Sequence, residues 1–330
     1  MLRRCLYFTA PRAVELREEP LPSPAAGQAL AQTVCSAISA GTELLLYRGE
    51  APAALAADET ITALGGALAF PLKYGYSAVG RIIAIGPGVD PAWQNRLVFA
   101  FNPHETHFVA ETQNLIPLPP DLDPADAVFL PNMETAVNFL HDGGPLVGER
   151  VAVFGQGAVG LLTTALLSRF PLASLVTFDH YPLRRTLSLQ CGAHQSLHSP
   201  PPALHDFDLV YELSGSPAAL DEAIALTGFD GRVVVGSWYG TNRARLDLGG
   251  RFHRSRIKLI SSQVSTLNPH LTGRWTKSRR LQTALNLLSE IRPSRFITHR
   301  LPFAEAAQAY ALLGEKPEEA AQVVLEFEEQ

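Results

Sequence analysis

The stretch that decides the fold is Val-Ala-Val-Phe-Gly-Gln-Gly-Ala-Val-Gly, residues 151–160, in which an apolar run enters a complete G-x-G-x-x-G turn. The pattern predicts a strand over 151–154 and a helix over 158–170. A strand, a glycine-rich turn and a helix in this order form the pyrophosphate cradle of dinucleotide-binding domains. The stretch therefore predicts a nicotinamide dinucleotide site rather than a merely structural turn.

Each glycine of the turn has its own predicted role. Gly155 permits the tight turn, Gly157 lets the backbone approach the phosphates, and Gly160 lets the helix pack closely on the strand. The amide groups at the start of the helix, around Ala158 and Val159, are predicted to face the anion.

An acidic residue follows at the expected distance. A second apolar strand over 175–178 ends at Asp179, about 20 residues beyond the last glycine, where a ribose-binding carboxylate is expected. Such a carboxylate accepts both ribose hydroxyls of NAD and repels the 2′-phosphate of NADP. Arg184 and Arg185, which follow shortly after, weaken this preference for NAD without reversing it. In dinucleotide-binding proteins that this segment resembles, an arginine at the spacing of Arg184 lies against the adenine.

Composition excludes several classes of protein. The chain has 330 residues, 46% of them hydrophobic and 18% charged, with a formal net charge of −5. A nucleic-acid partner is not expected, because such proteins show a basic excess. The sequence contains neither an apolar run as long as a membrane span nor a signal-peptide core, so we expect a cytoplasmic protein that makes no membrane contact. The three scattered cysteines are expected to be buried small hydrophobes.

The chain is predicted to have two kinds of architecture. Residues 1–120 are typical of short strands broken by turns, with an Ala-rich segment, 50–70, interpreted as a lid or loop insertion. From about 135 to 267, apolar strands alternate with helical patterns, as in a parallel sheet covered on both faces. The tail predicts two helices and a last strand that return to the first domain. In addition to the elements at 151–154, 158–170 and 175–178, the sequence predicts strands at 29–38, 77–85, 96–101, 207–213, 232–236, 257–263 and 322–327, and helices at 217–227, 278–291 and 303–313.

Several further segments carry a family resemblance. Ser-Ala-Ile-Ser-Ala-Gly-Thr-Glu at 36–43, Tyr-Gly-Tyr-Ser-Ala-Val-Gly at 74–80 and the segment 297–310 match conserved frames of the medium-chain dehydrogenase/reductase superfamily. The chain resembles this superfamily over nearly its whole length. The resemblance implies an α/β protein with a GroES-like catalytic β domain at 1–134, completed by 268–330, and a doubly wound parallel-sheet Rossmann domain at 135–267. It also implies a homodimer, and a nicotinamide held between the two domains.

The departures from the family concern its catalytic zinc. Ala40 stands where zinc members carry a cysteine, Tyr76-Ser77 where they carry His-Glu, and the third ligand position falls near Pro131. Alanine and proline side chains offer no donor atom, so no metal is expected there. This combination most resembles the zinc-lacking branch that includes bacteriochlorophyllide hydroxyethyl dehydrogenases. His104 and His107 offer an alternative metal pair, but packing or surface roles are favoured for both.

Without a metal, hydroxyl groups become the candidate catalytic groups. Tyr76, with Ser77 beside it, is a candidate proton donor or oxyanion binder, and nearby Lys73 could lower its pKa. The alternative is a structural tyrosine that lines the cleft. Thr42 and Glu43 occupy the family's Thr-Asp position, where the acid either relays protons or orients its neighbours.

The resemblance adds residues on the cofactor side. Glu134 is a candidate for contact with the nicotinamide, with charge complementarity at a helix start as the alternative. Ser214 and Gly215 are implied to pass the adenosine ribose, and Gly236 and Ser237 to reach the nicotinamide side.

These residues support three interpretations. The leading one is a zinc-independent NAD(P)-dependent oxidoreductase that moves a hydride between nicotinamide and a secondary alcohol or ketone. The second is a metal-free enone or quinone reductase. The third is a catalytically silent dinucleotide-binding protein. The substrate is expected to be a small molecule that the sequence does not identify.

Overall fold

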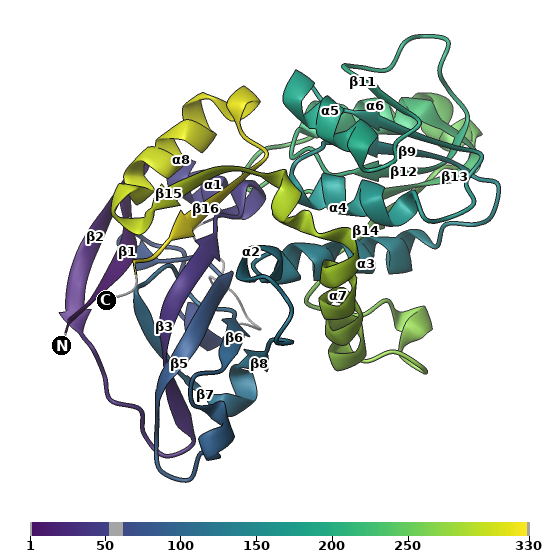
Figure 1. The fold of residues 1–330 in the computed structure, drawn as a ribbon. Coiled ribbons are helices and arrows are strands. Elements are labelled where there is room, and N and C mark those ends of the chain that lie inside the picture. Colours follow the sequence, from purple (N-terminus) through teal and green to yellow (C-terminus); the bar gives the residue numbers. More distant parts are fainter. Residues whose placement is uncertain (1, 53–61, 329–330) are drawn as a thin grey trace. The chain divides into compact units, whose positions relative to one another are not determined.

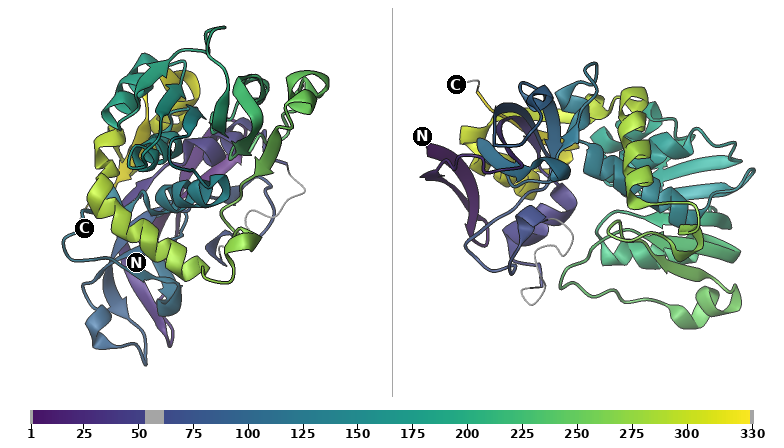
Figure 2. Two further views of the ribbon diagram at one scale, coloured as in Figure 1. Left: turned by 90° about the vertical axis from the view of Figure 1, so that its right-hand side faces the viewer. Right: turned by 90° about the horizontal axis from the view of Figure 1, so that it is seen from below.

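The computed structural model describes residues 2–52 and 62–328, and it divides into two compact units. The first comprises Met1–Pro131, Arg292–Lys316 and Gln322–Gln330, and the second comprises Asn132–Ile291 and Pro317–Ala321. This division differs from the sequence-based one, because residues 268–291 belong to the second unit and not to the first. The reason is helix α7 (Lys277–Ile291), whose buried Arg280 bonds to the second unit's own helix α3 (Leu130–Gly143). Figure 2 shows α7 as a straight yellow-green helix in front of this unit.

The first unit is built on two sheets. The smaller has the strand order β2-β1-β4, and the larger has the order β15-β16-β3-β5-β6-β8, with β7 also paired to β3. The last strand of the chain, drawn in yellow in Figure 1, pairs antiparallel with β3, so residues near both ends of the sequence lie side by side. The strands are β1 (Leu2–Ala10), β2 (Ala13–Pro20), β3 (Gln28–Ala37), β4 (Leu72–Lys73), β5 (Ala78–Ile85), β6 (Leu97–Ala100), β7 (His107–Glu111), β8 (Ile116–Pro117), β15 (Ile297–Pro302) and β16 (Gln322–Glu326).

Short helices connect these strands. The predicted helix at 303–313 begins as the 3-10 turn η7 (Phe303–Glu305) and continues as α8 (Ala306–Glu315). Of the segment interpreted as a lid, residues 53–61 lie outside the described residues. The other helices of this unit are α1 (Ala40–Arg48), α2 (Pro124–Ala127), η1 (Thr62–Leu64), η2 (Pro91–Trp93), η3 (Thr112–Asn114) and η6 (Pro293–Phe296).

The second unit contains the predicted parallel sheet. Its six strands have the order β11-β10-β9-β12-β13-β14, and every pair is parallel. The chain leaves the central strand β9 towards β10 and later returns to β12 on its other side, which makes this the doubly wound arrangement expected from the sequence. The strands are β9 (Arg150–Phe154), β10 (Ser174–Phe178), β11 (Gln195–Leu197), β12 (Phe207–Glu212), β13 (Thr227–Val235) and β14 (Lys258–Ser261).

Both faces of this sheet are buried, which explains the continuous apolar runs in its strands. Val151 and Val153 of β9 pack in one core cluster, whereas Ala152 and Phe154 pack in another. The remaining helices are α4 (Ala158–Leu167), α5 (Pro182–Gln190), α6 (Pro217–Leu226), η4 (Leu248–Phe252), η5 (Pro269–Leu271) and η8 (Pro317–Glu319). Across residues 2–52 and 62–328, no helix has the length and apolar character of a membrane span.

The cysteines are buried small side chains, as expected from the sequence. Cys5, Cys35 and Cys191 are all buried. Burial raises the pKa of the Cys35 thiol to about 12, so this thiol is protonated and unreactive at neutral pH.

Candidate functional site

The glycine-rich turn places a different constraint on each glycine. Gly155 has a φ of +84°, and a Cβ atom there would lie 2.5 Å from the Cα of Ser214. A Cβ on Gly160 would lie 1.9 Å from the carbonyl oxygen of Gly155. A Cβ on Gly157 would meet no atom within 4 Å. Gly155 and Gly160 are thus required by the protein itself, whereas the space in front of Gly157 is open to a ligand.

The open space lies at the start of α4. Gly157 is the N-cap residue of this helix, and Ala158 and Val159 form its first turn, where backbone amides have no partner within the helix. All three residues are partly exposed. This turn can therefore hold an anion with backbone donors and the helix dipole.

Asp179 lies beside the turn, directly after β10. Its Oδ2 accepts a hydrogen bond from the amide of Gln156 at 2.7 Å, and its Oδ1 accepts one from the amide of Tyr181 at 2.9 Å. Each carboxylate oxygen has a second acceptor position. Asp179 thus fixes the glycine-rich turn, while its predicted contact with the ribose hydroxyls stays a prediction.

Arg184 serves another part of the second unit. Its Nη2 donates to the carbonyl oxygens of Pro317 at 3.0 Å and of Ala320 at 2.8 Å, and its guanidinium lies 4.9 Å from the centroid of the Tyr181 ring. Arg185 donates to the carbonyl oxygen of Asp179 at 2.9 Å. These contacts give Arg184 a structural role in holding the segment Pro317–Ala321, while its predicted contact with adenine stays a prediction.

The loops after β12 and β13 are joined by a carboxylate that sequence reasoning missed. Glu212 is fully buried, and its Oε1 accepts hydrogen bonds from the amide of Ser214 at 2.8 Å and from the hydroxyl of Ser214 at 2.5 Å. Its Oε2 accepts the phenol of Tyr239. Glu212 could have been identified from the sequence because it is an acidic residue at the end of an apolar strand, as Asp179 is after β10.

The predicted residues of these two loops lie close together. The amide of Gly215 donates to the hydroxyl of Ser237 at 2.8 Å. Gly236 is required by packing, because a Cβ there would lie 2.3 Å from Cζ of Phe139. Ser214, Gly215, Gly236 and Ser237 therefore form one linked group at the carboxyl edge of the sheet, where open α/β sheets bind ligands.

In the first unit, three hydroxyl groups meet at the start of α1. The phenol of Tyr76 forms hydrogen bonds with the hydroxyl of Ser39 and, at 3.4 Å, with that of Thr42. All three side chains are partly exposed. Ser77 does not belong to this group, since it is 2% exposed and its hydroxyl donates to the carbonyl oxygen of Val128.

Behind this group lies a network of fully buried polar side chains. Glu43 accepts hydrogen bonds from the amide of Ser39 at 2.8 Å and from the phenol of Tyr310, and it contacts Nε2 of His104 at 3.0 Å. His104 Nδ1 contacts the hydroxyl of Ser36 at 2.8 Å. Burial, together with the Glu43 carboxylate, raises the pKa of the Tyr310 phenol well above its usual value.

The buried network defines what Glu43 and His104 can do. Ser36, His104 and Glu43 are connected like a hydrolase triad, but each has 0% exposure, so no substrate reaches the serine. Glu43 orients its neighbours, the second of the two roles considered for it. His104 has the packing role that the sequence favoured, and no group of three or more potential ligands suited to a metal occurs among the described His, Cys, Asp and Glu side chains.

Lys73 has partners other than the one considered for it. Its ammonium lies 3.2 Å from a carboxylate oxygen of Glu19 and 3.7 Å from one of Glu105. These carboxylates pair with the charge of Lys73. The suggestion that Lys73 lowers the pKa of Tyr76 stays a prediction.

Glu134 is held within the second unit. It is 9% exposed, and its Oε1 accepts a hydrogen bond at 3.1 Å from Arg280, which is 1% exposed. Arg280 also donates to the side chain of Asn138 and to the carbonyl oxygens of Val264 and Thr266. Burial raises the pKa of the Glu134 carboxyl, although Arg280 opposes this shift. The predicted contact between Glu134 and nicotinamide stays a prediction.

Arg280 was also missed by sequence reasoning. The signal was its position, because it shares the buried face of α7 with Ala284, Leu288 and Ile291. A cation at an apolar position of an amphipathic helix is expected to have buried partners.

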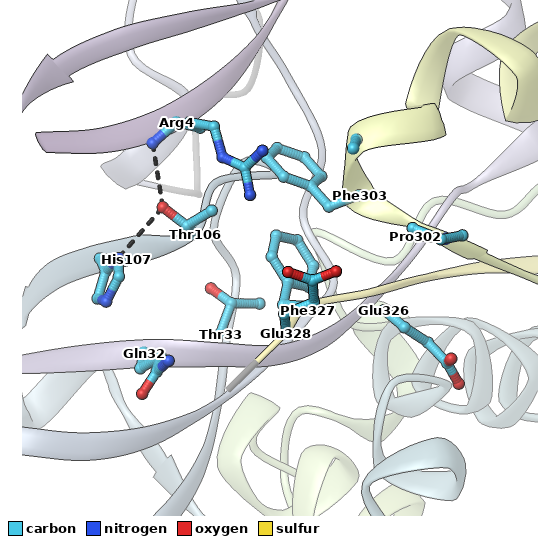
Figure 3. Close-up of a pocket in the computed structure, with 11 residues that line it drawn as sticks. Arg4, Gln32, Thr33, Thr106, His107, Pro302, Phe303, Glu326, Phe327 and Glu328 are labelled. Carbon is cyan, nitrogen blue, oxygen red and sulfur yellow. Dashed lines mark hydrogen bonds between the residues drawn. The ribbon is translucent and has the colours of Figure 1, made fainter. Parts of the chain in front are cut away.

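A pocket of about 140 Å³ lies elsewhere in the first unit (Figure 3). Arg4 and Thr106 line one side of it, and the stacked rings of Phe303 and Phe327 line another. None of the three residues whose hydroxyls meet at the start of α1, namely Ser39, Thr42 and Tyr76, lines this pocket. The pocket is therefore separate from the candidate catalytic residues.

Comparison with known proteins supports the resemblance found in the sequence. No family model matches the chain. L-idonate 5-dehydrogenase (NAD(P)(+)) of Escherichia coli is 24% identical over 229 residues, which are 66% of this chain and 62% of that enzyme. The 2-desacetyl-2-hydroxyethyl bacteriochlorophyllide A dehydrogenase of Rhodobacter capsulatus is 23% identical over 96% of both chains. The predicted similarity to zinc-type alcohol dehydrogenase-like proteins, including the bacteriochlorophyllide branch, is confirmed.

A solved structure supports the fold. A protein described as a short chain alcohol dehydrogenase of Escherichia coli CFT073, in complex with NADH, superimposes with a TM-score of 0.80, 19% identity and 99% coverage of both chains. The predicted α/β fold class with a Rossmann-like parallel sheet is confirmed. The named relatives are dehydrogenases, which supports an oxidoreductase that uses a nicotinamide cofactor.

Proposed function

We propose that this protein is a zinc-independent, NAD-dependent oxidoreductase that transfers a hydride between nicotinamide and a small secondary alcohol or ketone. The observation that carries the proposal is the hydrogen bond between the phenol of Tyr76 and the hydroxyl of Thr42. Tyr76 stands where zinc members of the family carry a ligand, and Thr42 stands at the family's Thr-Asp position. Asp179 and the glycine-rich turn supply the dinucleotide half of the reaction. The two relatives from the sequence comparison are, by their names, dehydrogenases of L-idonate and of a hydroxyethyl bacteriochlorophyllide.

The residues at the family's zinc positions do not fit a zinc ion. Ala40 and Pro131 present no nitrogen, oxygen or sulfur atom in their side chains, whereas a catalytic zinc requires about three protein donors. Tyr76 offers a phenol that is already bonded to Ser39. Elemental analysis of the purified protein tests this point, and zinc near one ion per chain would overturn it.

The chemistry then depends on neutral hydroxyl donors. Tyr76 donates its proton to the substrate oxygen as hydride adds to the carbonyl carbon, and Thr42 provides a second hydrogen bond to that oxygen. Glu43 holds the backbone of this segment in place through the amide of Ser39. In the reverse direction the phenol oxygen receives the alcohol proton.

Replacing Tyr76 with Phe is expected to lower kcat about 100-fold or more, because a positioned general acid contributes at least this factor. The KM for NADH is expected to stay within about twofold, since the change lies in the first unit. Steady-state kinetics on a panel of ketones and secondary alcohols measures both values. Unchanged turnover by the variant would eliminate Tyr76 as the donor. Reduction of conjugated double bonds in place of ketones would favour an enone or quinone reductase. If no substrate of the panel is turned over, a catalytically silent dinucleotide-binding protein is favoured.

Replacing Asp179 with Asn is expected to weaken NADH binding about tenfold or more, because hydrogen bonds to a charged acceptor are lost. NADPH binding is expected to improve relative to NADH, since the repulsion of a 2′-phosphate is removed. Fluorescence titration with both cofactors measures the ratio, and the exposed Asp121→Asn change serves as control. A wild-type protein that prefers NADPH would refute the assignment of Asp179.

We also propose a cytoplasmic homodimer. The edge strand β14 of the parallel sheet is mostly exposed, and Leu259 on it is 38% exposed. An exposed edge strand with an apolar side chain is suited to pairing with a second copy. Analytical ultracentrifugation tests this proposal.

A further inference from the structure

We propose that Ser39 is a positioning residue of the catalytic group, which donates a hydrogen bond to the phenol oxygen of Tyr76 and so stabilises the phenolate that forms when Tyr76 gives up its proton. This inference rests on the proposed function. It adds a residue that was not among the candidates drawn from the sequence.

The first observation is that the Ser39 side chain does not cap the helix that begins after it. Ser39 is the N-cap residue of α1, yet its hydroxyl makes no capping hydrogen bond. The amides of Thr42 and Glu43 bond instead to the carbonyl oxygen of Ser39, at 3.1 and 2.8 Å. An N-cap hydroxyl normally contributes about 1 kcal/mol to a helix. Here the hydroxyl is directed to Tyr76 instead.

The second observation concerns the single proton of the Tyr76 phenol. The phenol donates to Thr42 over 3.4 Å, which is long for a hydroxyl hydrogen bond. Because a phenol has one proton, Ser39 donates the bond between the two hydroxyls whenever the proton of Tyr76 points to Thr42 or to a substrate oxygen. A substrate oxygen at normal hydrogen-bond distance would compete with this long bond to Thr42 for the proton of Tyr76.

The third observation is that the backbone of Ser39 is fixed from behind. Its amide donates to Glu43 at 2.8 Å, and the Glu43 carboxylate is itself held by His104 and Tyr310. A Cβ on Gly75 would lie 2.6 Å from Cδ2 of His104, so the ring fits tightly against the chain that carries Tyr76. The serine hydroxyl is therefore preorganised with respect to the phenol.

A reduced nicotinamide, when bound, would supply the hydride that forms the new C–H bond on the carbonyl carbon, so that the nicotinamide would be oxidised and the ketone reduced. The O–H bond of Tyr76 breaks, and the proton forms the O–H bond of the product alcohol. The phenolate is stabilised by the hydrogen bond from Ser39 and is later reprotonated by water.

Titration of the phenol tests the inference without any substrate. The protein has 8 tyrosines, and the difference in tyrosinate absorbance between wild type and the Tyr76→Phe variant isolates residue 76. In a Ser39→Ala background the same difference is expected to titrate about one pH unit higher, because a donor to the charged form is lost. Ser39→Thr, which keeps the hydroxyl, is expected to restore the wild-type titration. An unshifted titration in Ser39→Ala would overturn the proposal.

Kinetics provide the second readout. Ser39→Ala is expected to lower kcat about tenfold and to shift the pH profile of kcat by the same amount as the titration, with the KM for NADH unchanged. The exposed Ser23→Ala change, in the same unit, is the matched control. A shifted titration with unchanged kcat would overturn the catalytic part of the inference. A wild-type protein without carbonyl reductase activity would refute the proposed function, whereas the coupling of Ser39 with Tyr76 would still be decided by the titration.

Discussion

Replacing Gly157 with Ala is expected to leave the thermal stability of the protein unchanged and to weaken NADH binding about tenfold or more. The added methyl group meets no protein atom within 4 Å, so folding imposes no penalty. It fills the space through which the backbone approaches a pyrophosphate, and a loss of about 1.4 kcal/mol in binding corresponds to that factor. Calorimetric titration with NADH and a thermal melt measure the two quantities.

Gly160→Ala is the matched control, because it adds the same methyl group three residues later. There the methyl group would lie 1.9 Å from the carbonyl oxygen of Gly155, a backbone atom that cannot move without opening the turn. We expect a loss of about 3 kcal/mol in the free energy of unfolding. Equal effects of the two substitutions on stability would contradict the separate roles assigned to these glycines.

Replacing Arg280 with Ala is expected to destabilise the second unit by about 3 to 5 kcal/mol, because removal of one partner of a buried ion pair leaves the other uncompensated. The carboxylate of Glu134 would lose its cation, and the carbonyl oxygens of Val264 and Thr266 would lose their donor. Urea unfolding followed by circular dichroism measures the change in free energy.

The neighbouring Arg279→Ala change is the control for Arg280. Arg279 is exposed on the same helix, so a change within about 0.5 kcal/mol is expected there. In Glu134→Gln, which keeps a hydrogen-bond acceptor, the loss is expected to be smaller than in Arg280→Ala. A stability loss in Arg280→Ala no larger than that in Arg279→Ala would show that the buried pair contributes little.

The strand, turn and helix of the dinucleotide half could be predicted in detail from the sequence, whereas the cofactor contacts of its residues stay predictions. Gly155, Gly157, Gly160 and Asp179 lie within this short segment, where each residue acts on its near neighbours. The conformational demands of that segment are the same wherever the unit occurs. Local spacing is therefore a sufficient signal.

The other half of the candidate site, the hydroxyl groups of Ser39, Thr42 and Tyr76, could be predicted only in part. Tyr76 and Thr42 were identified because their positions match a family frame. Lys73, which was considered as a partner of Tyr76, forms ion pairs with two carboxylates. Ser77 was grouped with Tyr76 because it is adjacent in sequence. Successive residues in an extended segment point in opposite directions, so the hydroxyl of Ser77 reaches Val128 and not the site.

The sequence by itself determined the class of the protein: a parallel sheet of apolar strands, a glycine-rich turn for a dinucleotide, and no donor atoms at two of the family's zinc positions. Only the tertiary structure decided which side chains meet. Glu43 bonds to Tyr310, 267 residues away, and Arg280 bonds to Glu134, 146 residues away. Such contacts arise because packing brings distant elements together. Neither the spacing nor the periodicity of a sequence predicts which two distant polar groups will lie opposite each other.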